Sequence, residues 1–267
     1  MPFRFAAYVI VAMIGTTIVA FWPSYFSTLA SAPWGFHFHG ITASLWMLLL
    51  AFQSWSIHNR QRRLHRIAGI GSLVLFPFFL AGSMAVVLSM ARATPANPFY
   101  QVYGARLGIM DATTPIILGW LYFHALSDRR NTQLHARFMM ATPLLLIMPI
   151  ISRLATRFIP ALAMHGPEDF HLFVWGMRIA NTVSVTCAAW LFATSPRFGR
   201  PFLATGIFML GQAVLFETVA LTRAWPSAFT AMGRLPMFPT LMLTFLAAAA
   251  LSWFGWQAGT LSKLRSA

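Results

Sequence analysis

The sequence predicts an all-α fold, a polytopic membrane helix bundle of about eight transmembrane helices. Hydrophobic residues make up 58% of the 267 residues and charged residues only 9%, too few to cover a globule of this size in water. Apolar runs of roughly 17 to 25 residues recur along the chain, which is the length a helix needs to cross a bilayer. We therefore expect residues 1–267 to form a single integral membrane domain.

The helices are expected in order from apolar runs centred near Ala12, Leu48, Phe78, Ile117, Leu146, Val183, Leu210 and Ala248. Short connections around Pro33, Arg62, Pro95, Arg129, Pro167, Pro196 and Pro226 interrupt helical periodicity. A loop ending Leu64-His65-Arg66 is similar to one ending Leu134-His135-Ala136-Arg137, 70 residues later. Residues 36–158 are therefore a candidate core bundle. Gly69, Gly71, Gly206 and Gly211 are expected to permit close approach of helices.

Basic residues predict the orientation of the chain, because short basic loops translocate poorly across a membrane. With the N-terminus inside and eight crossings, twelve of the nineteen basic residues fall inside: Arg4, Arg60, Arg62, Arg63, Arg66, Arg129, Arg130, Arg137, Arg197, Arg200, Lys263 and Arg265. Only Arg92, Arg223 and Arg234 fall in external loops. Both termini are therefore expected inside, and the expected location is a bacterial inner membrane.

The net charge of +14 does not indicate a nucleic-acid partner, because such a partner needs basic residues gathered on a solvated face. These arginines lie between apolar runs, and the expected partner is the lipid bilayer. Cys187 is the only cysteine, so the chain can form no internal disulfide or cysteine-ligated cluster.

Charged residues inside the apolar runs are the best indication of function, because ionised groups are costly in hydrocarbon. The polar residues expected in the external half are His37, His39, Arg106, Asp111, Arg153, Arg157, His171, Arg178, Asn181 and Glu217. Of these, Arg106, Asp111, Arg153, Arg178, Asn181 and Glu217 are the candidates for a polar cavity. We expect Asp111 and Glu217 to pair with Arg153 or Arg178. The pairs either fix helix packing or line an externally open cavity for an anion, a quinone or a lipid headgroup.

Histidines form the second candidate group, since histidines of neighbouring helices can ligate haem iron while arginines pair with the propionates. The candidate ligands of an inner haem b are His65, His124 and His135, of which His124 is expected to be the best buried. An outer haem would need His37 or His39 together with His171. Alternatively, His65 and His135 are residues at the membrane interface that lie at the starts of their helices and bind no haem. His58 is interpreted as an ordinary interface histidine. No metal other than haem iron is expected.

The stretch His37-Phe38-His39-Gly40, followed by His65-Arg66 and Gly69, resembles uncharacterised bacterial multi-pass membrane families. Their pattern is a histidine-glycine helix start followed by an HRxxG helix start, and the resemblance covers about residues 35–157. These families are distantly similar to transmembrane b-type cytochromes, so the resemblance implies haem binding and electron transfer. The chain departs from a diheme cytochrome in lacking four evenly placed buried histidines.

Three functions thus remain open. The first is a haem-binding, b-type electron-transfer protein. The second is a transporter-like or ligand-binding bundle with the external polar cavity. The third is an accessory subunit of a larger membrane complex, for which the short loops would be suitable.

Overall fold

The computed structural model describes residues 2–261, and every regular element within that range is a helix. The α-helices are α1 (Ala6–Phe21), α2 (Trp34–His58), α3 (Arg62–Ala93), α4 (Pro98–Ser127), α5 (Thr132–Ala141), α6 (Ile147–Phe158), α7 (Phe173–Ala193), α8 (Arg200–Glu217), α9 (Ala224–Met232) and α10 (Met237–Leu261). The all-α prediction is confirmed. Lys263 and Arg265 lie outside the described residues.

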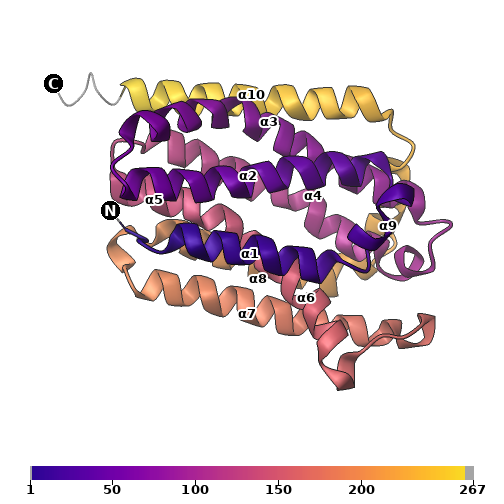
Figure 1. The fold of residues 1–267 in the computed structure, drawn as a ribbon. Helices are drawn as coiled ribbons and strands as arrows, with labels where there is room; N and C mark the ends of the chain where they lie inside the picture. Colours follow the sequence, from indigo (N-terminus) through magenta and orange to yellow (C-terminus); the bar gives the residue numbers. More distant parts are fainter. Residues whose placement is uncertain (1, 262–267) are drawn as a thin grey trace.

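Long helices run side by side in one bundle, with α5 and α6 continuing one another through the 3-10 turn Thr142–Leu146 (Figure 1). α1 begins and α10 ends at the same end of the bundle, which we call the terminal end. The α2–α3 and α4–α5 connections also lie there, whereas α9 lies at the opposite, distal end.

Six helical segments within residues 2–261 are long and apolar enough to cross a membrane: Trp34–His58, Arg62–Ala93, Thr132–Phe158, Pro167–Ala193, Arg200–Leu221 and Met237–Thr260. α1 is apolar but has only 16 residues. α4 has 30 residues but carries Arg106, Asp111 and His124, and it is not among the six. Membrane insertion is thus consistent with the helices, while the count of eight crossings stays a prediction.

The centre of the bundle is an aromatic cluster that joins α2, α3 and α4. Trp46 lies 5.3 Å from Phe76 and 5.4 Å from Tyr122 between ring centroids, and Phe76 stacks on Tyr122 at 4.1 Å. The polar groups of Trp46 and Tyr122 both make hydrogen bonds. Trp46 Nε1 donates to Thr142 Oγ1 over 3.2 Å, and the Tyr122 and Ser72 hydroxyls are hydrogen-bonded at 2.7 Å. Three helices and the turn after α5 are therefore held at one level.

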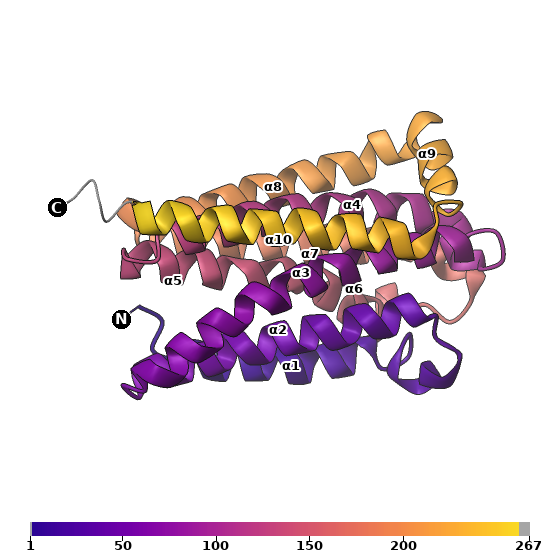
Figure 2. The same cartoon turned by 90° about the horizontal axis from the view of Figure 1, so that it is seen from above.

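Helix α3 crosses the bundle obliquely, from α2 at the terminal end toward α10 (Figure 2). Its close approach to α2 depends on Gly82, where an added Cβ would lie 2.6 Å from Thr42 Oγ1 and 3.0 Å from the Cα of His39. The glycine prediction is wrong for Gly71 and Gly211, since nothing lies within 4 Å of the Cβ position at either.

Replacing Gly82 with alanine should destabilise the bundle by about 1–3 kcal/mol, because the methyl group would push α2 away from α3. Gly71→Ala, in the same helix, is the matched control and should be neutral or stabilising by up to about 1 kcal/mol. Thermal unfolding of both variants in detergent measures the difference. Equal stability of the two variants would show that the α2–α3 crossing does not require Gly82.

Candidate functional site

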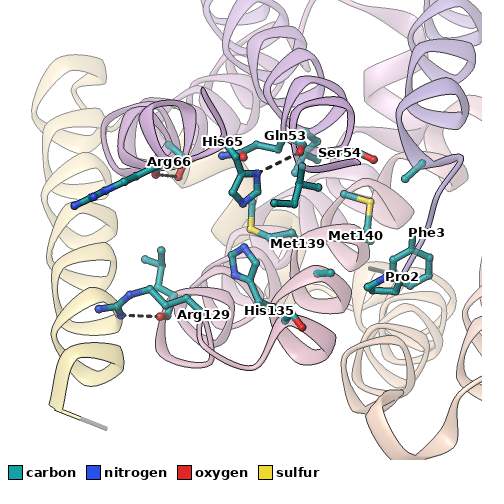
Figure 3. A pocket seen from close by; sticks show the side chains of 18 of the residues that line it. Pro2, Phe3, Gln53, Ser54, His65, Arg66, Arg129, His135, Met139 and Met140 are labelled. Carbon is teal, nitrogen blue, oxygen red and sulfur yellow. Dashed lines mark hydrogen bonds between the residues drawn. The ribbon is translucent and has the colours of Figure 1, made fainter. Parts of the chain in front are cut away.

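A cavity of about 390 Å³ lies at the terminal end of the bundle, and side chains of α2, α3, α4, α5 and α10 line it together with Pro2 and Phe3 (Figure 3). Most of its wall is apolar, from residues such as Leu50, Ile57 and Met140. Its polar residues include Gln53, Ser54, His58, His65, Arg66, Arg129 and His135. The volume is in the range of small-molecule sites.

His65 and His135 face each other across this cavity (Figure 3), with ring centroids 6.5 Å apart and ring planes at 83°. Each is the fourth residue of its helix, α3 and α5 respectively. The start of α5 is set by Asn131, whose side chain accepts hydrogen bonds from the backbone N–H groups of Gln133 and Leu134. The two loop sequences that are similar at an offset of 70 residues thus place His65 and His135 at equivalent positions of their helices and close together in the fold.

Both histidines are held in the same tautomer by backbone carbonyl groups. Nδ1 of His65 bonds to the carbonyl of Gln53 at 3.2 Å, and Nδ1 of His135 bonds to the carbonyl of Ala125 at 2.7 Å. A carbonyl oxygen only accepts, so the hydrogen is on Nδ1 and each Nε2 keeps a lone pair. Metal-binding histidines in proteins are commonly oriented in this way.

Two arginines, Arg66 and Arg129, lie on the side of the cavity nearest α10 (Figure 3). Arg129 is fixed there, because its guanidinium donates to the carbonyl of Trp256 over 2.8 Å and lies 4.4 Å from the Trp256 ring centroid. The site thus has permanent positive charge at one edge.

The α2 wall of the cavity holds polar atoms without partners. Among the described residues, Gln53 Oε1, Ser54 Oγ and His58 Nε2 are buried and make no hydrogen bond, and all three residues line the cavity. Buried polar atoms are almost always bonded to protein or water, and these three are exceptions. His58, interpreted from the sequence as an ordinary interface histidine, is among the residues that line this cavity. The available signal was the pair Gln53-Ser54 within an apolar run, one turn before His58.

The other histidines lie elsewhere. His124 does not line the cavity and stacks on Phe138 at 5.3 Å. His37 Nδ1 bonds to the hydroxyl of Tyr25 at 2.9 Å, and the His39 ring stacks on Phe79 with the ring centroids 5.9 Å apart. His171 is exposed, with Nδ1 bonded to the carbonyl of Glu168 at 2.9 Å. Within residues 2–261 no ring contact or hydrogen bond joins His171 to His37 or His39, and the outer haem stays a prediction.

Glu217 is the centre of the charged cluster at the distal end. Its carboxylate accepts from Arg106 Nη2 and from Arg178 Nε, each over 2.9 Å. Arg106 also donates to the carbonyl of Phe216 over 3.1 Å and lies over that ring at 4.0 Å. The predicted pairing of Glu217 with Arg178 is confirmed, and Arg106 is a partner that the sequence analysis missed. With both carboxylate oxygens bonded, the cluster is suited to fixing helices α4, α7 and α8.

The pairing expected for Asp111 is wrong as a direct ion pair. In the described part of the chain Asp111 has no basic nitrogen within 4.0 Å, although Arg153 is near enough for a longer-range attraction. Arg153 instead donates to the carbonyl of Pro149 over 3.0 Å and lies 4.0 Å from the ring centroid of Phe21. Asn181, on α7, makes no side-chain hydrogen bond in the described range.

The comparisons with known proteins add no assignment: no protein-family model, curated protein or solved structure matches this chain. The resemblance to b-type cytochromes stays a prediction.

Replacing Glu217 with glutamine should lower stability by about 1–3 kcal/mol, because it leaves Arg106 largely buried without a counter-charge. Glu168→Gln removes an exposed carboxylate and should change stability by no more than about 0.5 kcal/mol. Thermal melting in detergent compares the two. A Glu217 variant as stable as the Glu168 variant would mean that the distal cluster does not hold the helices together.

Proposed function

We propose that this chain is an integral membrane protein that binds one b-type haem in the terminal-end cavity and acts in electron transfer. The observation that carries the proposal is the opposed pair His65 and His135, each with Nδ1 bonded to a carbonyl group and Nε2 free. Their ring centroids are 6.5 Å apart, and the two Nε2 atoms would be the groups that hold the iron.

The rest of the cavity supports the same ligand. Its apolar walls suit a porphyrin face, and Arg66 and Arg129 are positioned at one edge to pair with propionates. Haem iron with two histidine ligands supplies one-electron chemistry, with a potential tuned by ligands and burial. The carbonyl groups of Gln53 and Ala125 would orient the ligating rings. The proposal assigns no role to His37, His39, His124 or His171.

The alternatives have less support. A transporter-like cavity around Arg178 is disfavoured because Glu217 already occupies the two guanidinium groups beside it. No observation specifically favours an accessory subunit.

We further propose that α1 and α4 also cross the membrane, giving eight crossings with both termini inside. α4 packs on α3, α5, α8 and α10, and α1 packs on α2 and α6. Arg106 of α4 is neutralised by Glu217, which lowers the cost of burying this helix. The start of α1 and the end of α10 lie at one end of the bundle, which supports an even number of crossings.

Protein purified in detergent from haem-replete cells should show a Soret band. His65→Ala and His135→Ala should each lower the haem content by at least roughly tenfold, since even outer-shell partners of a metal ligand are worth 10–100-fold. His124→Ala and His171→Ala are matched controls and should keep the wild-type haem content. Absence of a Soret band from the wild type, or its retention in both ligand variants, would refute the haem proposal.

Single-cysteine labelling tests the topology, because Cys187 is the only cysteine to remove. In a Cys187→Ser background, Ser227→Cys in α9 should react with an impermeant maleimide on intact cells. Gln61→Cys, in the α2–α3 connection, should react only after permeabilisation. Five crossings separate these positions if α4 spans the membrane, and four if it does not. Labelling of both residues from the same side would therefore exclude a spanning α4.

A further inference from the structure

We propose that Asp111 is a proton-binding site inside the bundle, whose carboxylate takes up one proton from water and releases it again. Asp111 lies near the middle of α4 (Pro98–Ser127), about 20 Å from either end of the helix. It shares a helix face with Leu118 and Tyr122, seven and eleven residues later, which are 3% and 0% exposed. Asp111 is thus on the face of α4 that packs into the bundle.

The other acidic residues of the chain have bonded partners or contact with solvent. The sequence contains five acidic residues, and the structure describes all of them. Glu217 and Asp128 pair with arginines, and Asp169 accepts a hydrogen bond from a backbone N–H group. Glu168 is exposed. In the described part of the chain, Asp111 is the acidic residue that is neither exposed nor bonded.

The surroundings of this carboxylate favour the uptake of a proton. An ionised carboxylate without a bonded partner is costly in an apolar environment, and such a group becomes neutral instead. Taking up one proton turns the carboxylate into a carboxyl group with an O–H donor, and no electron moves. Each oxygen of Asp111 has surface that a water molecule can touch, since neither is among the closed polar atoms without partners. Water can therefore deliver the proton and accept it again.

Two ionisable groups of the described residues are close enough to act on Asp111 electrostatically: Arg153 of α6, and Tyr100 of α4 itself. Arg153 donates to the carbonyl of Pro149 over 3.0 Å and lies 4.0 Å from the ring centroid of Phe21. Its guanidinium therefore attracts the carboxylate without bonding to it. The phenol of Tyr100 is uncharged near neutral pH.

The helices packed against α4 bring no second acid to this site. α9 and α10 contain no charged residue in the described range, and Arg92, at the end of α3, donates to backbone carbonyl groups. The other basic residues of α3 and all those of α5 lie in the first two turns, at the terminal end. On α8, Glu217 is saturated by arginines, and Arg200 pairs with Asp128. Asp111 therefore binds its proton as a single group.

This proposal goes beyond haem binding and does not depend on it. The haem proposal concerns His65 and His135 in the terminal-end cavity, which Asp111 does not line. Proton binding by Asp111 can be measured whether or not the purified protein has a Soret band.

Infrared spectroscopy tests the proposal, because a protonated carboxyl group has a C=O stretching band that a carboxylate lacks. An aspartate in water is only about 1% protonated at about pH 6. The protein, purified in a detergent without ester groups, should show a carboxyl band at that pH, and the band should decline reversibly as the pH is raised. Transfer to D2O should lower its frequency, because the bound proton exchanges with solvent.

Asp111→Asn should lose this band, and it keeps the size of the neutral acid. Glu168→Gln is the matched control, since it removes an exposed carboxylate, and it should keep the band. Arg153→Gln should retain the band to a pH higher by up to about one unit, because it removes the positive charge that favours the ionised form.

If Asp111→Asn does not fold, the D2O shift and the Arg153→Gln variant still test the assignment. Absence of a carboxyl band from the wild type at about pH 6, its retention in Asp111→Asn, or an unchanged frequency in D2O would overturn the proposal.

Discussion

The aromatic cluster of Trp46, Phe76 and Tyr122 is the contact on which the rest of the bundle depends. In hydrocarbon an indole N–H or a phenol O–H without a partner is costly, and here Thr142 and Ser72 satisfy both groups. The cluster therefore fixes the rotation of α2, α3 and α4 as well as their separation. Because Tyr122 and Ser72 also line the cavity, the same contacts set the shape of its floor.

A shortage of acidic residues is the second constraint. With 19 basic and 5 acidic residues, most guanidinium groups can have no carboxylate, and many rest on aromatic rings instead. Arg153 lies over Phe21, Arg129 over Trp256, and the buried Arg137 is close to the rings of both Phe3 and Phe198. Cation–π contact of this kind is strongest where water is excluded. It gives part of the abundant phenylalanine and tryptophan an electrostatic role in addition to packing.

The features predictable from the sequence are those that depend on position along the chain. Apolar run length predicted the helices, and the 70-residue repeat correctly indicated that His65 and His135 are equivalent, because each is the fourth residue of its helix. Features that depend on helix rotation could not be predicted. His124, expected to be the best buried ligand, stacks on Phe138, while His58 is among the residues that line the cavity.

The two ends of the bundle use polar groups in opposite ways. At the distal end Glu217 is saturated by Arg106 and Arg178, so the charges that first suggested a ligand site satisfy one another. At the terminal end His58 and two neighbours keep unbonded atoms, and carbonyl groups hold the opposed histidine pair with both Nε2 lone pairs available. A fold gains no stability from unpaired buried acceptors. Three of these atoms belong to residues that line the terminal-end cavity, and the histidine pair in the same cavity is the arrangement on which the haem proposal depends.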